Sequence, residues 1–367
     1  MSLALWLAIA VGCLATPTAT AELSYGVHVD YANSYEHKRL TLGGASLVRT
    51  PLRWQDVEPS RNRGRDWDTM DLVVTRALRN GLSLLPVIVG SPGWAAPSPS
   101  EQPRSRGDLR RFKQFVSAAV ARYGPGGRLF SKNPLLPYRP ITAWEVWNEP
   151  NLSLFWNGDP DPREYAEFLQ LTSTAIRRVD PGATVVLAGM PEDAGRIPAS
   201  EFLQQLYRVP DIDQAFDVVA AHPYEASVTG IKESLHRLRY TMDSNSDAET
   251  EIWITELGWA SGGPPSNWHV TTRTGQAELF RQTFTMLAAE QARLRLGPVI
   301  WFDLRDRERP AGARDLWWYH TGFFERDGDP KPAWQAFVTL VGGDPGSGRM
   351  ATKAEASPPR GLPEVSP

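Results

Sequence analysis

The stretch WEVWNEPN (144–151) combines a strand-forming, mostly apolar run with an abrupt polar ending. Tryptophan and valine favour a buried strand, and Asn148 and Glu149 follow directly after them. Pro150 has no amide hydrogen and therefore cannot extend a central strand. The sequence thus predicts a buried strand that ends in two polar side chains.

Similar β-rich runs recur along the chain. Together with the first they are YGVHVDY (25–31), SLVRTPLRW (46–54), LSLLPVIVG (82–90), ITAWEVWNE (141–149), ATVVLAG (183–189), FDVVAAHPY (216–224), EIWITELGW (251–259) and GPVIWFDLR (297–305). Helical periodicity follows most of them, and it is weakest after the first run. The clearest helical segments are 108–124, 163–179, 275–291 and 331–341.

This alternation of strand and helix predicts an α/β protein with a single (β/α)8 barrel rather than two separate domains. An open doubly wound sheet is the alternative. Against it, no strand-to-helix turn carries a Gly-x-Gly-x-x-Gly dinucleotide fingerprint or a Gly-x-x-x-x-Gly-Lys phosphate loop.

A second glutamate, Glu256, ends the seventh run in TELGW (255–259). Catalytic groups of a barrel lie where its strands end. Strict alternation along the strand predicts that Ile252, Ile254 and Glu256 share one face, so that Glu256 points into the barrel mouth with Glu149. Two glutamates from different strands, set among indoles, are the pair needed to cleave a glycosidic bond.

WNEP with TELGW resembles the clan A glycoside hydrolases, a superfamily of retaining (β/α)8 enzymes, and the resemblance covers nearly the whole barrel. It implies that Glu149 is the acid/base and Glu256 the nucleophile. We expect Asn148 to hold the 2-hydroxyl of the sugar. Within the clan, the sequence looks closest to family 39 and related exopolysaccharide hydrolases.

Further positions match the same clan. VRTPLRW places Arg49 near the nucleophile, HPY supplies His222 and Tyr224, and Trp301 stands where the clan carries an indole platform beneath the sugar. We expect Tyr224 and Arg49 to hydrogen-bond Glu256 and keep it ionised.

Some of these residues have other possible roles. Arg49 has an alternative as the ion-pair partner of Glu145 inside the barrel, and His222 as a strand-end histidine with satisfied hydrogen bonds. Trp94 and His28 are candidate substrate contacts on a loop and on the first strand.

Composition and charge exclude several classes of function. The 367-residue chain has a net charge of -3, which gives no basic excess for nucleic acid. The histidines lack His-x-x-x-His spacing, and loop 159–164 lacks the ligand order of a calcium site, so we expect no metal and no other cofactor. We expect a monomer that binds carbohydrate and has no membrane span.

The two ends of the chain differ from its middle. Residues 1–21 are an apolar run that ends in Ala-Thr-Ala, which predicts a cleaved signal peptide and a secreted protein, extracellular or periplasmic. Lipid anchoring at Cys13, the single cysteine, is not favoured because flanking charge is missing. The predicted catalytic domain spans 22–342, and the Gly-, Pro- and Ser-rich tail 343–367 is expected to be disordered.

Long loops at the catalytic face suggest the substrate. With Trp94, Trp156, Trp268 and Trp317 or Trp318 on them, they predict a cleft for endo-acting hydrolysis of a β-linked polysaccharide, and nearby arginines leave room for an acidic chain. The alternatives are an exo-acting β-xylosidase-like enzyme, transglycosylation through the same intermediate, and an inactive carbohydrate-binding barrel.

Overall fold

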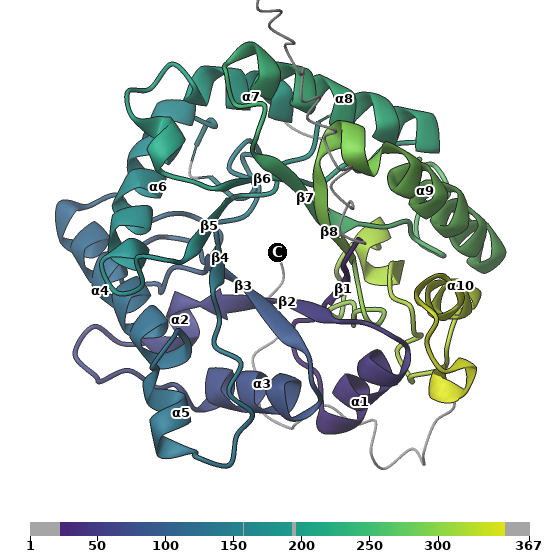
Figure 1. Ribbon diagram of the computed structural model, residues 1–367, viewed down its shortest axis with the longest axis horizontal. Helices are drawn as coiled ribbons and strands as arrows, with labels where there is room; N and C mark the ends of the chain where they lie inside the picture. The colour runs from purple at the N-terminus through teal and green to yellow at the C-terminus, as the bar shows by residue number, and fades with distance from the viewer. Residues whose placement is uncertain (1–22, 157, 193–195, 349–367) are drawn as a thin grey trace, which may run out of the picture.

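The computed structural model describes residues 23–156, 158–192 and 196–348, so the predicted signal peptide lies outside the described residues. Eight parallel strands close into a barrel in chain order, with helices around the outside (Figure 1). The strands are β1 Tyr25–His28, β2 Leu47–Arg53, β3 Ser83–Val89, β4 Ala143–Val146, β5 Thr184–Leu187, β6 Val218–Ala221, β7 Glu251–Leu257 and β8 Leu296–Trp301. The (β/α)8 prediction is confirmed, and each strand lies inside its predicted run except β8, which begins one residue before it.

Helices fill the connections between the strands. They are α1 Ser34–Leu42, α2 Trp54–Val57, α3 Asp68–Arg79, α4 Arg106–Tyr123, α5 Arg128–Lys132, α6 Pro162–Arg177, α7 Ala199–Leu206, α8 Val228–Ser244, α9 Arg273–Leu294 and α10 Pro332–Val341, with short 3-10 turns η1 Ile212–Gln214, η2 Trp317–His320 and η3 Pro345–Gly348. None of the helices among the described residues is long and apolar enough to cross a bilayer.

Helix α1 explains the weak signal after the first strand. Asn33 caps it and forms a reciprocal capping box with Glu36. The buried face, however, is polar: Glu36 pairs with Arg305 at 2.8 Å, and Arg39 donates to the carbonyls of Ser347 and Gly348. An amphipathic pattern cannot reveal a helix whose buried side chains are charged.

The end of the described chain packs against this helix. Residues 343–348 form η3, where Ser347 is buried and the amide of Asp344 donates to the carbonyl of Leu42 at 2.8 Å. The prediction of a disordered tail is therefore wrong for 343–348, because Arg39 donates to the carbonyls of Ser347 and Gly348. Residues 349–367 lie outside the described residues.

Two apolar layers are separated by the barrel wall. The larger one lies between strands and helices, and the smaller one fills the barrel near the strand N-termini. The inner group consists of Leu85, Val186, Val218, Ala220 and Ile300. Polar side chains occupy the barrel above them, so the same strands carry a packed floor and a polar mouth.

Candidate active site

The chain turns sharply where β4 ends, and this turn aims Glu149 across the mouth. Trp147 has φ 74° and Glu149 φ 44°, the left-handed region that side-chain-bearing residues rarely adopt. Their amides donate to the carbonyls of Ile88 and Gly189, at 3.1 and 3.0 Å, so the neighbouring strand ends hold the turn on both sides. Such strained backbone is typical of functional sites, and Pro150 prevents the strand from continuing.

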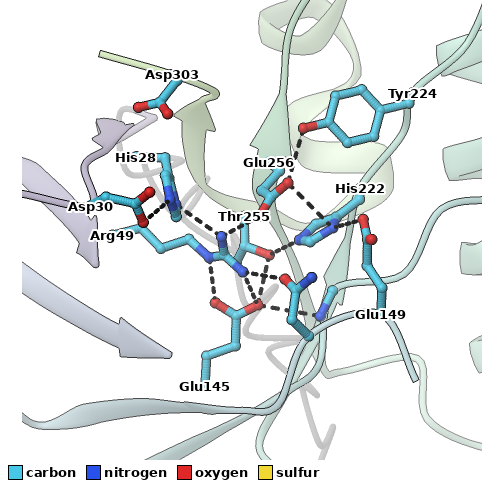
Figure 2. A network of polar contacts seen from close by, with 12 residues as sticks. His28, Asp30, Arg49, Glu145, Glu149, His222, Tyr224, Thr255, Glu256 and Asp303 are labelled. Carbon is cyan, nitrogen blue, oxygen red and sulfur yellow. Dashed lines mark hydrogen bonds and ion pairs between the residues drawn. The ribbon is translucent and has the colours of Figure 1, made fainter. Parts of the chain in front are cut away.

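An irregularity in β7 aims Glu256. Ile254 pairs with Val299 and Leu257 with Trp301, so β7 advances three residues over a stretch in which β8 advances two. Such a bulge re-aims side chains next to it. Thr255 and Glu256 both reach the interior of the barrel (Figure 2).

Glu256 points into the mouth, as predicted, but for a different reason than strict alternation. Ile252 and Ile254 pack in the outer layer, whereas Trp253 packs against the inner one. Glu256 therefore does not share a face with the two isoleucines as strict alternation predicted. It points into the mouth because the bulge changes the register.

Arg49 on β2 connects the network beneath the mouth (Figure 2). Its Nε and Nη2 donate to Glu145 at 2.7 and 3.1 Å, and its Nη1 donates to Glu256. Its Nη2 also donates to Asn148 Oδ1 at 3.0 Å. Both predicted roles of Arg49, contact with Glu256 and ion pairing with Glu145, are thus present together.

Glu145 has four donors although it is fully buried. Besides Arg49, the hydroxyl of Thr255 and the amide of Gly189 donate to Oε1, at 3.0 and 3.3 Å. A buried carboxylate is tolerated when its lone pairs are satisfied in this way. Glu145 therefore fixes Arg49 from below.

The carboxylate of Glu256 is held in its charged form. The Tyr224 hydroxyl donates to Oε2 at 2.9 Å, and His222 Nδ1 lies 3.7 Å from the same oxygen. Burial alone would raise the pKa of Glu256, but the charges of His222 and Arg49 and the Tyr224 hydrogen bond outweigh it and lower the pKa to about 2. The predicted contacts from Arg49 and Tyr224 are confirmed.

Glu149 is shifted in the opposite direction. Burial is the largest influence and raises its pKa, and the charge of Glu256 acts in the same sense, against a 2.7 Å hydrogen bond to His222 Nδ1. His222 is fixed from its other side by the Thr255 hydroxyl at 3.0 Å from Nε2. Environments that push two carboxyls apart in pKa assign one as acid and the other as base or nucleophile.

The two carboxyls are close together. One oxygen each of Glu149 and Glu256 and one nitrogen of His222 lie within 4.8 Å of one another. Three such atoms could also surround a cation, but His222 Nδ1 and Tyr224 already bond the two carboxylates. Retaining glycosidases place their carboxyls about 5–5.5 Å apart, against about 6.5–9.5 Å in inverting enzymes, and the spacing here fits the shorter class.

A cavity of about 460 Å³ opens above these residues. Of the predicted site residues, Asn148, Glu149, Tyr224, Glu256 and His28 line it, whereas Arg49 and His222 lie buried behind the carboxylates they bond. Its lining also includes Asp30, Arg53, His269, Phe302, Arg307, Trp317 and Trp318.

Two predicted aromatic contacts lie elsewhere. Trp301 is fully buried in the outer layer, stacked on Phe323, and Phe302 faces the cavity in its place. Because successive residues of a strand point to opposite sides, Phe302, one position after Trp301, is the residue that faces the cavity. Trp94 packs edge-on against Trp54, outside the cavity lining, and donates to the carbonyl of Glu58 at 3.0 Å.

The other loop tryptophans also differ in whether they line the cavity. Trp156 is fully buried, whereas Trp268 is exposed and stacks on His269, which in turn stacks on Trp317. Only Trp317 and Trp318 of the expected loop walls line the cavity.

Sequence reasoning missed several lining residues, among them Asp30, Phe302 and His269. Asp30 follows β1, accepts from Arg53 at 3.0 Å and lies 3.3 Å from Arg307. Phe302 was detectable from the alternation of β8. The neutral His269 belongs to a loop without periodicity, and burial lowers its pKa to about 3.

Comparisons with known proteins agree with this geometry. Residues 139–302, a little under half of the chain, match the family model described as glycosyl hydrolase catalytic core. They contain both strand-end glutamates, Glu149 and Glu256. No curated protein matches the sequence.

Solved structures share the fold. A family 39 glycoside hydrolase from Bacteroides cellulosilyticus WH2 aligns with TM-score 0.63 and 20% identity over 87% of this chain and 63% of its own. A monomeric β-xylosidase from Caulobacter crescentus CB15 aligns with 0.64 and 16%, over 87% and 67%. An intracellular xylanase from Thermoanaerobacterium saccharolyticum aligns with 0.60 and 18%, over 86% and 95%.

This chain thus spans less than two thirds of the family 39 structure, and at these identities the likeness is one of fold. These neighbours share the predicted (β/α)8 barrel, and residues 139–302 are similar to a glycosyl hydrolase catalytic core.

Proposed function

We propose that this chain, which carries a glycosyl hydrolase catalytic core at residues 139–302, is a secreted β-glycosidase that retains anomeric configuration. The close spacing of Glu149 and Glu256, combined with their opposite pKa shifts, carries the proposal. The expected secretion rests on the predicted signal peptide alone.

The reaction proceeds in two displacements. Glu256 attacks the anomeric carbon while the bond to the leaving oxygen breaks and that oxygen takes the proton of Glu149. Glu149, now ionised, then removes a proton from water as the water attacks the same carbon. The ester bond that the first step formed between Glu256 and the anomeric carbon then breaks, and Glu256 is again a carboxylate.

The neighbouring groups suit these roles. Arg49 and Tyr224 keep Glu256 ionised for attack. Arg49 also fixes the amide of Asn148, a residue of the cavity lining, by donating to its Oδ1, so that Nδ2 is the atom that can donate to a substrate. A donor there meets the sugar 2-hydroxyl, a contact that strengthens in the transition state.

Endo action on a β-linked polysaccharide stays a prediction, and the lining of the cavity argues against it. Trp94, Trp156 and Trp268 lie outside the cavity lining, so the expected aromatic cleft loses three of its walls. The xylosidase and xylanase activities named for the structural neighbours make β-xylosides the first substrates to try.

A panel of nitrophenyl β-glycosides tests the proposal directly. We expect release of nitrophenol from at least one sugar, and loss of turnover on the order of 10⁴-fold or more in Glu256→Gln, comparable with removal of a covalent nucleophile in other hydrolases. Glu278→Gln, at an exposed position on α9, is the matched control and should keep full activity. Sugar binding without turnover across the panel would favour the inactive carbohydrate-binding barrel.

A further inference from the structure

One side of the cavity wall carries charged side chains beside aromatic ones such as Phe302 and Trp317, and the other side is mostly apolar. Besides the two catalytic glutamates, the charged lining residues are Asp30, Arg53 and Arg307, which follow or end β1, β2 and β8. The mostly apolar side, here called the apolar half, follows β3, β4 and β5. Its main members are Val89, Pro99, Leu152, Leu154, Phe155 and Pro191.

The apolar half lies on the side of the acid. Glu149 gives its proton to the glycosidic oxygen, so the leaving group must lie beside Glu149. The same loop continues into Leu152, Leu154 and Phe155, and the amide of Leu152 donates to the carbonyl of Glu149 at 3.0 Å. The leaving group therefore meets these side chains first.

The apolar turn has a defined position. The indole of Trp147 donates to the carbonyl of Phe155 at 2.8 Å, and the amide of Phe155 donates to the carbonyl of Leu152 at 3.1 Å. Leu154 stands at the rim with 48% of its surface exposed. A large exposed leucine at the mouth of a site is free to cover a bound apolar group.

This half offers few partners for sugar hydroxyls. Among the described residues that line it, and apart from Asn148 and Glu149, the polar side chains are Ser98 and Ser100, whose hydroxyls bond each other at 3.0 Å. A second sugar placed here would exchange water for apolar surface at several hydroxyls, which is unfavourable. An alkyl or aryl group would only gain contacts.

We propose that the leaving-group side of this site binds an apolar aglycone, so that the substrates are alkyl or aryl β-glycosides rather than oligosaccharides. This inference rests on the proposed glycosidase function and specifies its substrate class.

A series of alkyl β-glycosides of one sugar, from methyl to octyl, tests it. The alcohols differ little in acidity, so a change along the series reports contacts with the chain. We expect kcat/KM to rise on the order of twofold to fourfold per methylene until the apolar wall is covered. The disaccharide of the same sugar should be a poorer substrate than the hexyl glycoside.

Leu154→Ser should flatten this dependence on chain length. Leu135→Ser is the matched control, since Leu135 is 98% exposed and lies before β4, away from the mouth. Its chain-length dependence should equal that of the unaltered protein.

The outcomes distinguish failure of the apolar site from failure of the glycosidase function. A flat alkyl series with better turnover of oligosaccharides would overturn the apolar site while leaving the glycosidase intact. Absence of turnover for every glycoside, including the nitrophenyl panel, would overturn the glycosidase function itself, and the apolar site with it.

Discussion

At the scale of single residues, the site depends on how each carboxyl is bonded. Glu256 has the Tyr224 hydroxyl and Arg49 around it, whereas Glu149 has one imidazole and is otherwise desolvated. Chemically identical groups thus acquire pKa shifts in opposite directions from their neighbours.

These pKa shifts predict the pH dependence of kcat/KM. Glu256 must be ionised, so activity falls only as the pH approaches about 2, and Glu149 must be protonated, so activity falls as the pH rises through its raised pKa. In Glu149→Gln the alkaline limb should disappear for a dinitrophenyl glycoside, whose leaving group needs no acid. An unchanged alkaline limb in this variant would assign it to another group.

Asn148 provides a test of substrate positioning. Asn148→Ala removes the donor to the 2-hydroxyl, and we expect kcat/KM to fall by about 10–10³-fold, because this bond strengthens in the transition state. The same variant should show a much smaller loss with a 2-deoxy glycoside. Equal losses for both substrates would contradict the assigned contact.

At the scale of elements, the strand ends carry the site, and the sequence revealed them unevenly. WEVWNEPN and TELGW identified both glutamates because their residues are contiguous with buried strands. The β7 bulge was invisible, since it depends on pairing with β8 and not on local alternation. Alternation along β8 predicts that Phe302, and not Trp301, faces the cavity. Asp30 and His269 lie in loops, which have no periodic pattern that could reveal them.

The contacts of Arg49 connect β2, β4 and β7, so this side chain should matter for stability as well as activity. Arg49→Met leaves Glu145 buried without its main partner and should lower the free energy of unfolding by about 3–5 kcal/mol. Arg281→Met, which breaks the exposed pair with Glu278, should cost less than about 1 kcal/mol. Urea denaturation measures both, and similar small losses would mean that the buried network is not coupled.

At the scale of the whole molecule, closure of the barrel brings together residues that are far apart in sequence. His28 and Arg307 are neighbours of the same cavity only because β8 pairs with β1. The resulting mouth is asymmetric, with charged and aromatic side chains near the closure and mostly apolar ones after β3 to β5. We expect this asymmetry to give the substrate one orientation, with its leaving group toward Leu154 and its glycone toward the charged side of the mouth.

The most direct test of the account is the configuration of the first product. When a β-glycoside from the active panel is hydrolysed, proton NMR of the anomeric signals should show the β-anomer first, followed by slow mutarotation, because Glu149 and Glu256 lie too close for direct displacement by water. Appearance of the α-anomer first would contradict the two-step mechanism and the role of Glu256 as nucleophile.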